Sequence, residues 1–159
     1  MDKQIENIEN LKLVKTVVLN GLIGYCDTHD EKDYAIGVKE IKKIKKLDGT
    51  YIEQVVSQFP LCKNFEDELS WGKRYANVQM LIGDTPIDME HIDETKIVSM
   101  MGETTHEYYH CYSEYTGYLW TVEDFKIGGH DLLKILKSNE GKYIHLEIEL
   151  FDKKKSKPQ

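Results

Sequence analysis

The sequence predicts an α+β fold, with N-terminal helices and a mainly antiparallel β-sheet in the C-terminal half. Before Pro60, apolar side chains recur at steps of three and four residues, which is the period of an amphipathic helix. From Tyr75 onward, apolar and polar residues partly alternate, and the chain is dense in Thr, Tyr and Trp, which favour strands. Helices and strands that are segregated along a chain are typical of this fold class.

The composition fits one globular domain. Of the 159 residues, 40% are hydrophobic and 31% are charged, close to the average for folded proteins. We assign residues 1–151 to a single α+β domain and residues 152–159, which are rich in lysine, to a disordered basic tail. No apolar run is long enough for a membrane span, and the polar N-terminus is unlike a signal peptide. These features predict a cytoplasmic protein that does not bind a membrane.

The first elements are expected to be a helix and a strand. A short helix is predicted over residues 5–13, where the apolar residues have rough helical spacing. Residues 15–25 are rich in Val, Leu and Ile, which predicts a buried strand with a bend at Gly21.

Two more helices are expected before the sheet. Apolar residues at three-residue steps, with lysines between them, predict an amphipathic helix over residues 38–47 that stops at Asp48-Gly49. Thr50 is expected to cap the next helix, with Glu53 as its capping-box partner, and Pro60 to end it. A further short helix is expected within residues 64–71.

The second half is expected to contain most of the strands. They are predicted at residues 76–82, 96–101, within 104–121, and at 143–150. A turn-rich acidic connection over residues 83–94 separates the first two of these strands. After a tight turn at Gly128-Gly129, a short amphipathic helix is expected over residues 131–137, with candidate core residues Leu132, Leu133, Ile135 and Leu136.

The string His106-Glu107-Tyr108-Tyr109-His110 has the form H-E-x-x-H, which binds zinc in many metallohydrolases. On a helix, His106 and His110 would share one face as zinc ligands, with Glu107 as the general base. Glu114 would continue that face as a third ligand. This reading predicts a zinc metallopeptidase.

The residues around this string favour a strand instead. Two threonines and three tyrosines in residues 104–112 have poor helix propensity. On a strand, Glu107 would point away from the two histidines, which would lie about 7 Å apart. We therefore expect a strand here and a protein that is not an enzyme and has no cofactor. The zinc metallopeptidase with His106, His110 and Glu114 as metal ligands is the alternative.

The charge is unevenly distributed. The formal net charge is −7, and residues 84–114 hold eight acidic residues against one lysine. Such a segment repels nucleic acid and attracts a basic protein surface, although solvated acidic loops of this kind also serve solubility alone. We expect a partner-binding surface made of Asp84, Asp88, Glu90, Asp93, Glu94, Glu103, Tyr108 and Tyr112.

Residues 39–46 are basic, which raises a third hypothesis, that the protein is a regulator that binds DNA. A gel shift would test it.

Other residue clusters allow weaker readings. Three cysteines favour reduced, buried thiols over a disulfide framework. The alternative is a structural zinc site that joins Cys26 and His29 to His110 or Cys111. His130 is either part of a catalytic turn or the start of a helix, and the aspartates at 27, 30 and 33 lack the spacing of a calcium loop. The ten tyrosines suit a recognition surface or half-buried sheet positions.

The C-terminal third resembles small proteins carried by phages and mobile elements of low-GC Gram-positive bacteria. The resemblance lies in the order of three stretches, Cys111–Thr121, Gly128–Leu133 and Gly141–Ile148, and it includes no catalytic motif. Chain size, acidity and the abundance of lysine and isoleucine are similar to anti-CRISPR inhibitors of Cas9. The resemblance implies an inhibitor that binds a type II Cas9, or its guide-RNA complex, in the bacterial host. It implies no site residues, because these inhibitors share no common motif.

Overall fold

The structure is a computed structural model, and it describes residues 11–27, 34–65, 74–117 and 119–153. These residues form mostly β-structure. The eight strands are antiparallel, and they make one sheet in the order β3-β2-β1-β8-β4-β5-β6-β7. Their bounds are β1 (Leu11–Asp27), β2 (Tyr34–Lys45), β3 (Tyr51–Pro60), β4 (Tyr75–Gly83), β5 (Val98–Tyr112), β6 (Leu119–Ile127), β7 (His130–Asp131) and β8 (Tyr143–Lys153).

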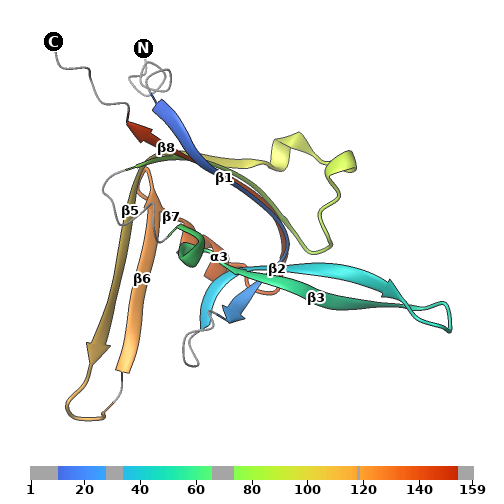
Figure 1. Ribbon diagram of the computed structural model, residues 1–159, viewed down its shortest axis with the longest axis horizontal. Coiled ribbons are helices and arrows are strands. Elements are labelled where there is room, and N and C mark those ends of the chain that lie inside the picture. The colour runs from blue at the N-terminus through green and yellow to red at the C-terminus, as the bar shows by residue number, and fades with distance from the viewer. Residues whose placement is uncertain (1–10, 28–33, 66–73, 118, 154–159) are drawn as a thin grey trace.

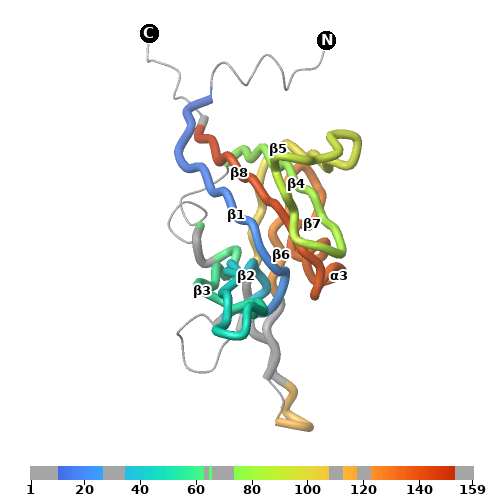
Figure 2. Tube along the Cα trace, turned by 90° about the vertical axis from the view of Figure 1, so that its right-hand side faces the viewer, coloured from blue at the N-terminus to red at the C-terminus, as the bar shows by residue number. Residues whose placement is uncertain are grey.

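The sheet curls around the short helix α3 (Leu132–Ser138), as Figure 1 shows. The 3-10 turn η1 (Cys62–Phe65) follows β3, and two further turns, η2 (Met89–His91) and η3 (Glu94–Lys96), lie in the connection from β4 to β5. Figure 2, turned by 90°, shows β8 between β1 and β4. None of the helices formed by the described residues has the length and apolar character to span a membrane.

The predicted α+β fold with N-terminal helices is wrong. Residues 38–47 and 50–59, both expected to be helical, lie in the β2–β3 hairpin. Its strands pair residue by residue, with Ile44 opposite Ile52 and Ile41 opposite Val55. Branched side chains of this kind lose rotamer freedom in a helix and pack well on a pleated ribbon.

The helix boundaries predicted at the tip of this hairpin are also wrong. Asp48-Gly49 is not the end of a helix, and Thr50 is not a helix cap. Asp48 Oδ1 accepts the backbone N–H of Thr50 at 2.9 Å, and Gly49 has a φ of 87°. The N–H of Lys46 donates to the carbonyl of Thr50 at 2.7 Å, which closes the hairpin. An Asp-Gly pair ends a helix or turns a hairpin equally well, so the pair alone does not discriminate.

Two predicted helices and the tail reach the edges of the described residues. Of the helix expected over residues 5–13, the part from Leu11 lies in β1, and residues 1–10 are outside the described residues. Of the helix expected within residues 64–71, only residues 64–65 are described, as the end of the 3-10 turn η1, and residues 66–73 are outside the described residues. Asp152 and Lys153, which we assigned to the tail, continue β8, whereas residues 154–159 are not described.

The later elements are confirmed. Strands occupy most of residues 15–25, 76–82, 96–101 and 143–150. The side chains of β8 alternate as predicted, since the inward ones are fully buried: Ile144, Leu146, Ile148 and Leu150. Helix α3 buries Leu132, Leu133 and Leu136 in the same core, and Ile135 packs against it. The core therefore lies on the concave side of the sheet, between the sheet and α3.

Two glycines allow neighbouring strands to approach each other closely. A Cβ atom on Gly21 would lie 2.0 Å from the carbonyl oxygen of Lys39. A Cβ atom on Gly37 would lie 2.0 Å from the carbonyl oxygen of Phe59. Real Cβ atoms are not found so close to backbone oxygens, so these two positions require glycine. The predicted bend at Gly21 is thus a point of close packing between β1 and β2.

Candidate functional site

The H-E-x-x-H string lies on a strand. It is part of β5, where His106 is opposite Phe125 and His110 is opposite Thr121 of β6. Successive residues of a strand face opposite sides of the sheet, so Glu107 and His106 lie on different faces. Glu114 lies in the turn after β5 and is exposed. These residues therefore do not form the one-turn helical arrangement of the zinc hydrolases, and the predicted strand is confirmed.

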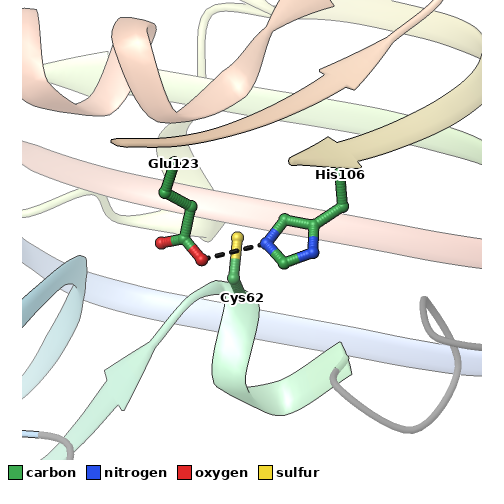
Figure 3. A group of neighbouring side chains, drawn as sticks. All are labelled: Cys62, His106 and Glu123. Atoms are coloured by element: carbon green, nitrogen blue, oxygen red, sulfur yellow. Dashed lines mark hydrogen bonds and ion pairs between the residues drawn. The ribbon is translucent and has the colours of Figure 1, made fainter. Parts of the chain in front are cut away.

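His106 instead meets two residues from other parts of the chain. Its Nε2 atom donates to Glu123 Oε2 at 2.9 Å. The Cys62 thiol lies beside this pair, and the three donor atoms are all within 4.8 Å of one another. Figure 3 shows the three side chains pointing toward one another from η1, β5 and β6.

The strand register explains why Glu123 reaches His106. Because His106 is opposite Phe125, Glu123 lies two positions along β6 on the same face and is the diagonal neighbour of the histidine. Phe125 and Ile127, which share this face, are fully buried. The carboxylate is therefore held at the margin of the core.

Cys62 lies at the start of η1, just after the end of the β2–β3 hairpin. After Pro60 the chain turns inward, and the N–H of Leu61 donates to the carbonyl of Ile36 at 3.1 Å. Leu61, Cys62 and Phe65 are buried as a result. The rings of Phe65 and Phe125 lie 5.9 Å apart between centroids, so η1 is packed against β6.

The site is shielded from water. Cys62 is 4% exposed, and the side chains of His106 and Glu123 are 21% and 18% exposed. Burial, together with the nearby Glu123 and Asp131 carboxylates, raises the pKa of the Cys62 thiol well above its ordinary range. The thiol is therefore protonated at neutral pH unless a cation lies beside it, and it does not act as a free nucleophile. The edge of the His106 ring meets Phe125, at 6.4 Å between centroids and 85° between planes.

A second histidine–carboxylate pair lies on the convex face of the sheet. His145 is 9% exposed and donates from Nε2 to Glu147 Oε2 at 2.8 Å. Its Nδ1 accepts the amide of Asn20 at 3.0 Å, and the same amide contacts the carbonyl of Ile87. Both ring nitrogens are thus used, and no cysteine belongs to this group among the described side chains.

The structure gathers five of the predicted partner-binding residues in one loop. The connection from β4 to β5, which we call the acidic loop (residues 84–97), carries exposed Asp84, Asp88, Glu90, Asp93 and Glu94. Glu103 is separate from them, because it lies on β5 and accepts from Tyr75 Oη at 3.5 Å. Tyr108 and Tyr112 are in β5, and their side chains are not described.

The acidic loop is shaped by its own aspartates. Asp88 accepts the N–H of Glu90 at 3.0 Å and contacts Nδ1 of His91 at 2.8 Å. Asp93 accepts the N–H of Thr95 at 3.0 Å and its hydroxyl at 2.6 Å. Hydrogen bonds from His91 and Glu90 lower the pKa of Asp88, and hydrogen bonds from Thr95 lower that of Asp93. Both carboxylates are held in the charged form.

The remaining candidates are mostly structural. Cys26 is buried in β1, and His29, Asp30 and Asp33 are outside the described residues. Asp131 accepts backbone N–H groups of α3 and is its N-cap, whereas His130 does not start the helix but pairs with Ile127 in β7. Cys62 and Glu123 were missed as site residues. An acidic residue in phase with buried Phe125 and Ile127 on β6 was the available sign for Glu123, whereas nothing local pointed to Cys62.

Comparison with protein-family models, curated proteins and solved structures gave no match.

Proposed function

We propose that this protein acts by binding a protein partner, and that the acidic loop is the surface that docks. The observation that carries this proposal is the exposure of five carboxylates on one short connection. Such a concentration of negative charge favours a basic surface on the partner and raises the association rate.

The acidic loop is also organised in advance for binding. Asp88 and Asp93 cap η2 and η3, so two of its turns are fixed by hydrogen bonds. The amide of Asn20 holds the carbonyl of Ile87 at 3.3 Å, which ties the loop to the convex face of the sheet. A surface that is ordered before binding loses less entropy when the complex forms. Met89, with 39% exposure, supplies an apolar contact among the acids.

The partner that we propose is a type II Cas9 in the bacterial cytoplasm, as the resemblance of the C-terminal third implies. A Cas9 holds its guide–target duplex in a positively charged channel. An acidic loop held by these hydrogen bonds would complement such a channel and occlude nucleic acid from it. The protein would then be an anti-CRISPR inhibitor that makes no direct contact with nucleic acid.

The test is a pair of charge reversals with equal change in net charge. Glu90→Lys with Glu94→Lys alters the acidic loop and spares the capping aspartates. Glu114→Lys with Glu140→Lys places the same change at exposed positions elsewhere. Binding to a Cas9–guide complex is measured by surface plasmon resonance at low and moderate salt, together with inhibition of DNA cleavage.

We expect the loop variant to associate at least tenfold more slowly, to lose its salt dependence and to lose inhibition. The control variant should behave like the unmodified protein. If the two variants show the same association rate and the same inhibition, the acidic loop is not the interface. Absence of binding by the unmodified protein would remove Cas9 as the partner.

A further inference from the structure

We infer that Cys62, His106 and Glu123 form a zinc-binding site that clamps η1 to the β5–β6 hairpin. This site differs from the one that the H-E-x-x-H string predicts, because only His106 belongs to both. It is also independent of the acidic loop, which lies on the connection between β4 and β5.

The geometry fits a tetrahedral ion. Zinc bonds of about 2.0 Å to nitrogen and oxygen and about 2.3 Å to sulfur place neighbouring donor atoms about 3.3–3.6 Å apart. Here the three donor atoms lie within 4.8 Å of one another, and the histidine nitrogen and carboxylate oxygen are 2.9 Å apart. Small side-chain movements, with no change in the backbone, would bring all three atoms to bonding distance.

The donor set selects the metal. A thiolate, an imidazole and a carboxylate together suit zinc, whereas magnesium and calcium prefer oxygen ligands alone. The charges also balance, because the thiolate and the carboxylate neutralise a divalent ion. Neutrality matters for a site whose residues are 4%, 21% and 18% exposed, since an unbalanced charge is costly there.

The fold gives the site a structural role. Its ligands come from η1, β5 and β6, which are separated in the sequence and meet only in the folded chain. Among the described side chains these three donors make up the group, and a water molecule would complete a tetrahedral coordination. An ion held by all three ligands would link η1 to both strands of the β5–β6 hairpin, and the site would therefore stabilise this arrangement.

A second histidine–carboxylate pair, on the convex face of the sheet, serves as a control for the proposed zinc site. His145 and Glu147 form a histidine–carboxylate pair at 2.8 Å, close to the 2.9 Å of His106 and Glu123, but without a thiol among the described side chains. The acidic loop offers a competing group, since Asp88, Glu90 and His91 also bring their ligand atoms within 4.8 Å, although all three are exposed.

The experiment starts from metal-free protein under reducing conditions and titrates it with zinc against a chromophoric chelator. We expect one zinc ion per chain. Cys62→Ser, His106→Gln and Glu123→Gln should each weaken binding at least tenfold. Cys26→Ser, His145→Gln and His91→Gln should leave it unchanged. Unaltered affinity in Cys62→Ser, or loss that follows His91→Gln, would overturn the inference.

Cobalt gives a second measurement that needs no variant. Cobalt(II) bound to the unmodified protein should show a thiolate-to-metal charge-transfer band in the near ultraviolet and the intense visible bands of a four-coordinate ion. Zinc should displace the cobalt and abolish both features. Binding without the charge-transfer band would mean that the thiol is not a ligand, and would overturn the site.

Discussion

Glu123 Oε2 lies 2.9 Å from His106 Nε2, although the two residues are diagonal neighbours and not a directly opposed pair of β5 and β6. The contact joins the two strands of the hairpin on the face that carries the buried residue Phe125. It gives His106 a partner in the absence of any metal.

Removing this carboxylate should destabilise the metal-free protein. Glu123→Ala leaves the partly buried ring of His106 without its acceptor, and we expect a loss of about 1 kcal/mol in the free energy of unfolding. Urea denaturation in the presence of a chelator measures it. Glu140→Ala, at an exposed position, is the control and should change the free energy little. Equal stabilities of the two variants would contradict this role of Glu123.

The N-cap of α3 should contribute more to the free energy of unfolding than the short length of the helix suggests. Asp131 Oδ1 lies 3.1 Å from the N–H of Leu133, 3.4 Å from that of Lys134 and 3.3 Å from that of Phe125. Asp131→Ala should cost about 1–2 kcal/mol of stability, because it removes the acceptor of the first helical N–H groups. Asp131→Asn should retain most of the stability, and a loss as large as that of alanine would contradict the capping role.

The close approach of β2 and β3 should make Gly37 intolerant of any side chain. Gly37→Ala places a Cβ atom 2.0 Å from the carbonyl oxygen of Phe59, so the two strands would have to separate. We expect loss of cooperative unfolding, or a fall of at least about 3 kcal/mol. Gly24→Ala is the matched control, because its new Cβ meets only the flexible side chain of Lys39 at 3.4 Å. Thermal denaturation of both variants gives the comparison.

Asp88 and Asp93 of the acidic loop should each titrate with a pKa below the ordinary value of 3.8. The lowered pKa means that each carboxylate keeps its charge and hydrogen bonds as the pH falls through 3.8, and loses them only below its own pKa. Carbon chemical shifts of the side-chain carboxyl groups follow this titration. Thr95→Val should raise the pKa of Asp93 and leave that of Asp88 unchanged, whereas equal changes at both would contradict the local cause.

The second half of the fold was predictable because its strands have one buried face. In β8, for example, Ile144 and Leu146 face the core while His145 faces the other side, which produces the alternation seen in the sequence. Helix α3 was predictable for the same reason, since its leucines lie on one buried stripe.

The β2–β3 hairpin was not predictable, since most of its outer part has no buried face. Val38 is buried near the base of the hairpin, but the side chains of β3 from Tyr51 to Val56 are all exposed. The spacing of Val38, Ile41 and Ile44 imitates a helix, yet on a strand it places Ile41 on the opposite face from the other two. A register shift at Glu40/Ile41 further disturbs the pattern.

Of the three residues of the candidate zinc site, only His106 could be predicted from the sequence. His106 was found from the motif, but its expected partners were neighbours in sequence. The actual partners are set by the register of β5 against β6 and by the inward turn after Pro60. Such tertiary contacts leave no local spacing to detect.

The pairing of β1 with β8 has a consequence for how the protein is made. Leu11 lies opposite Lys153 and Leu22 opposite Tyr143, so almost all of the described chain separates these strands in sequence. During synthesis, β1 has no partner on that edge until the ribosome has released β8. The long contact order predicts slow folding, with the apolar strands of the early chain exposed to chaperones in the meantime. The sheet is therefore completed only late in folding, after β8 has been synthesised.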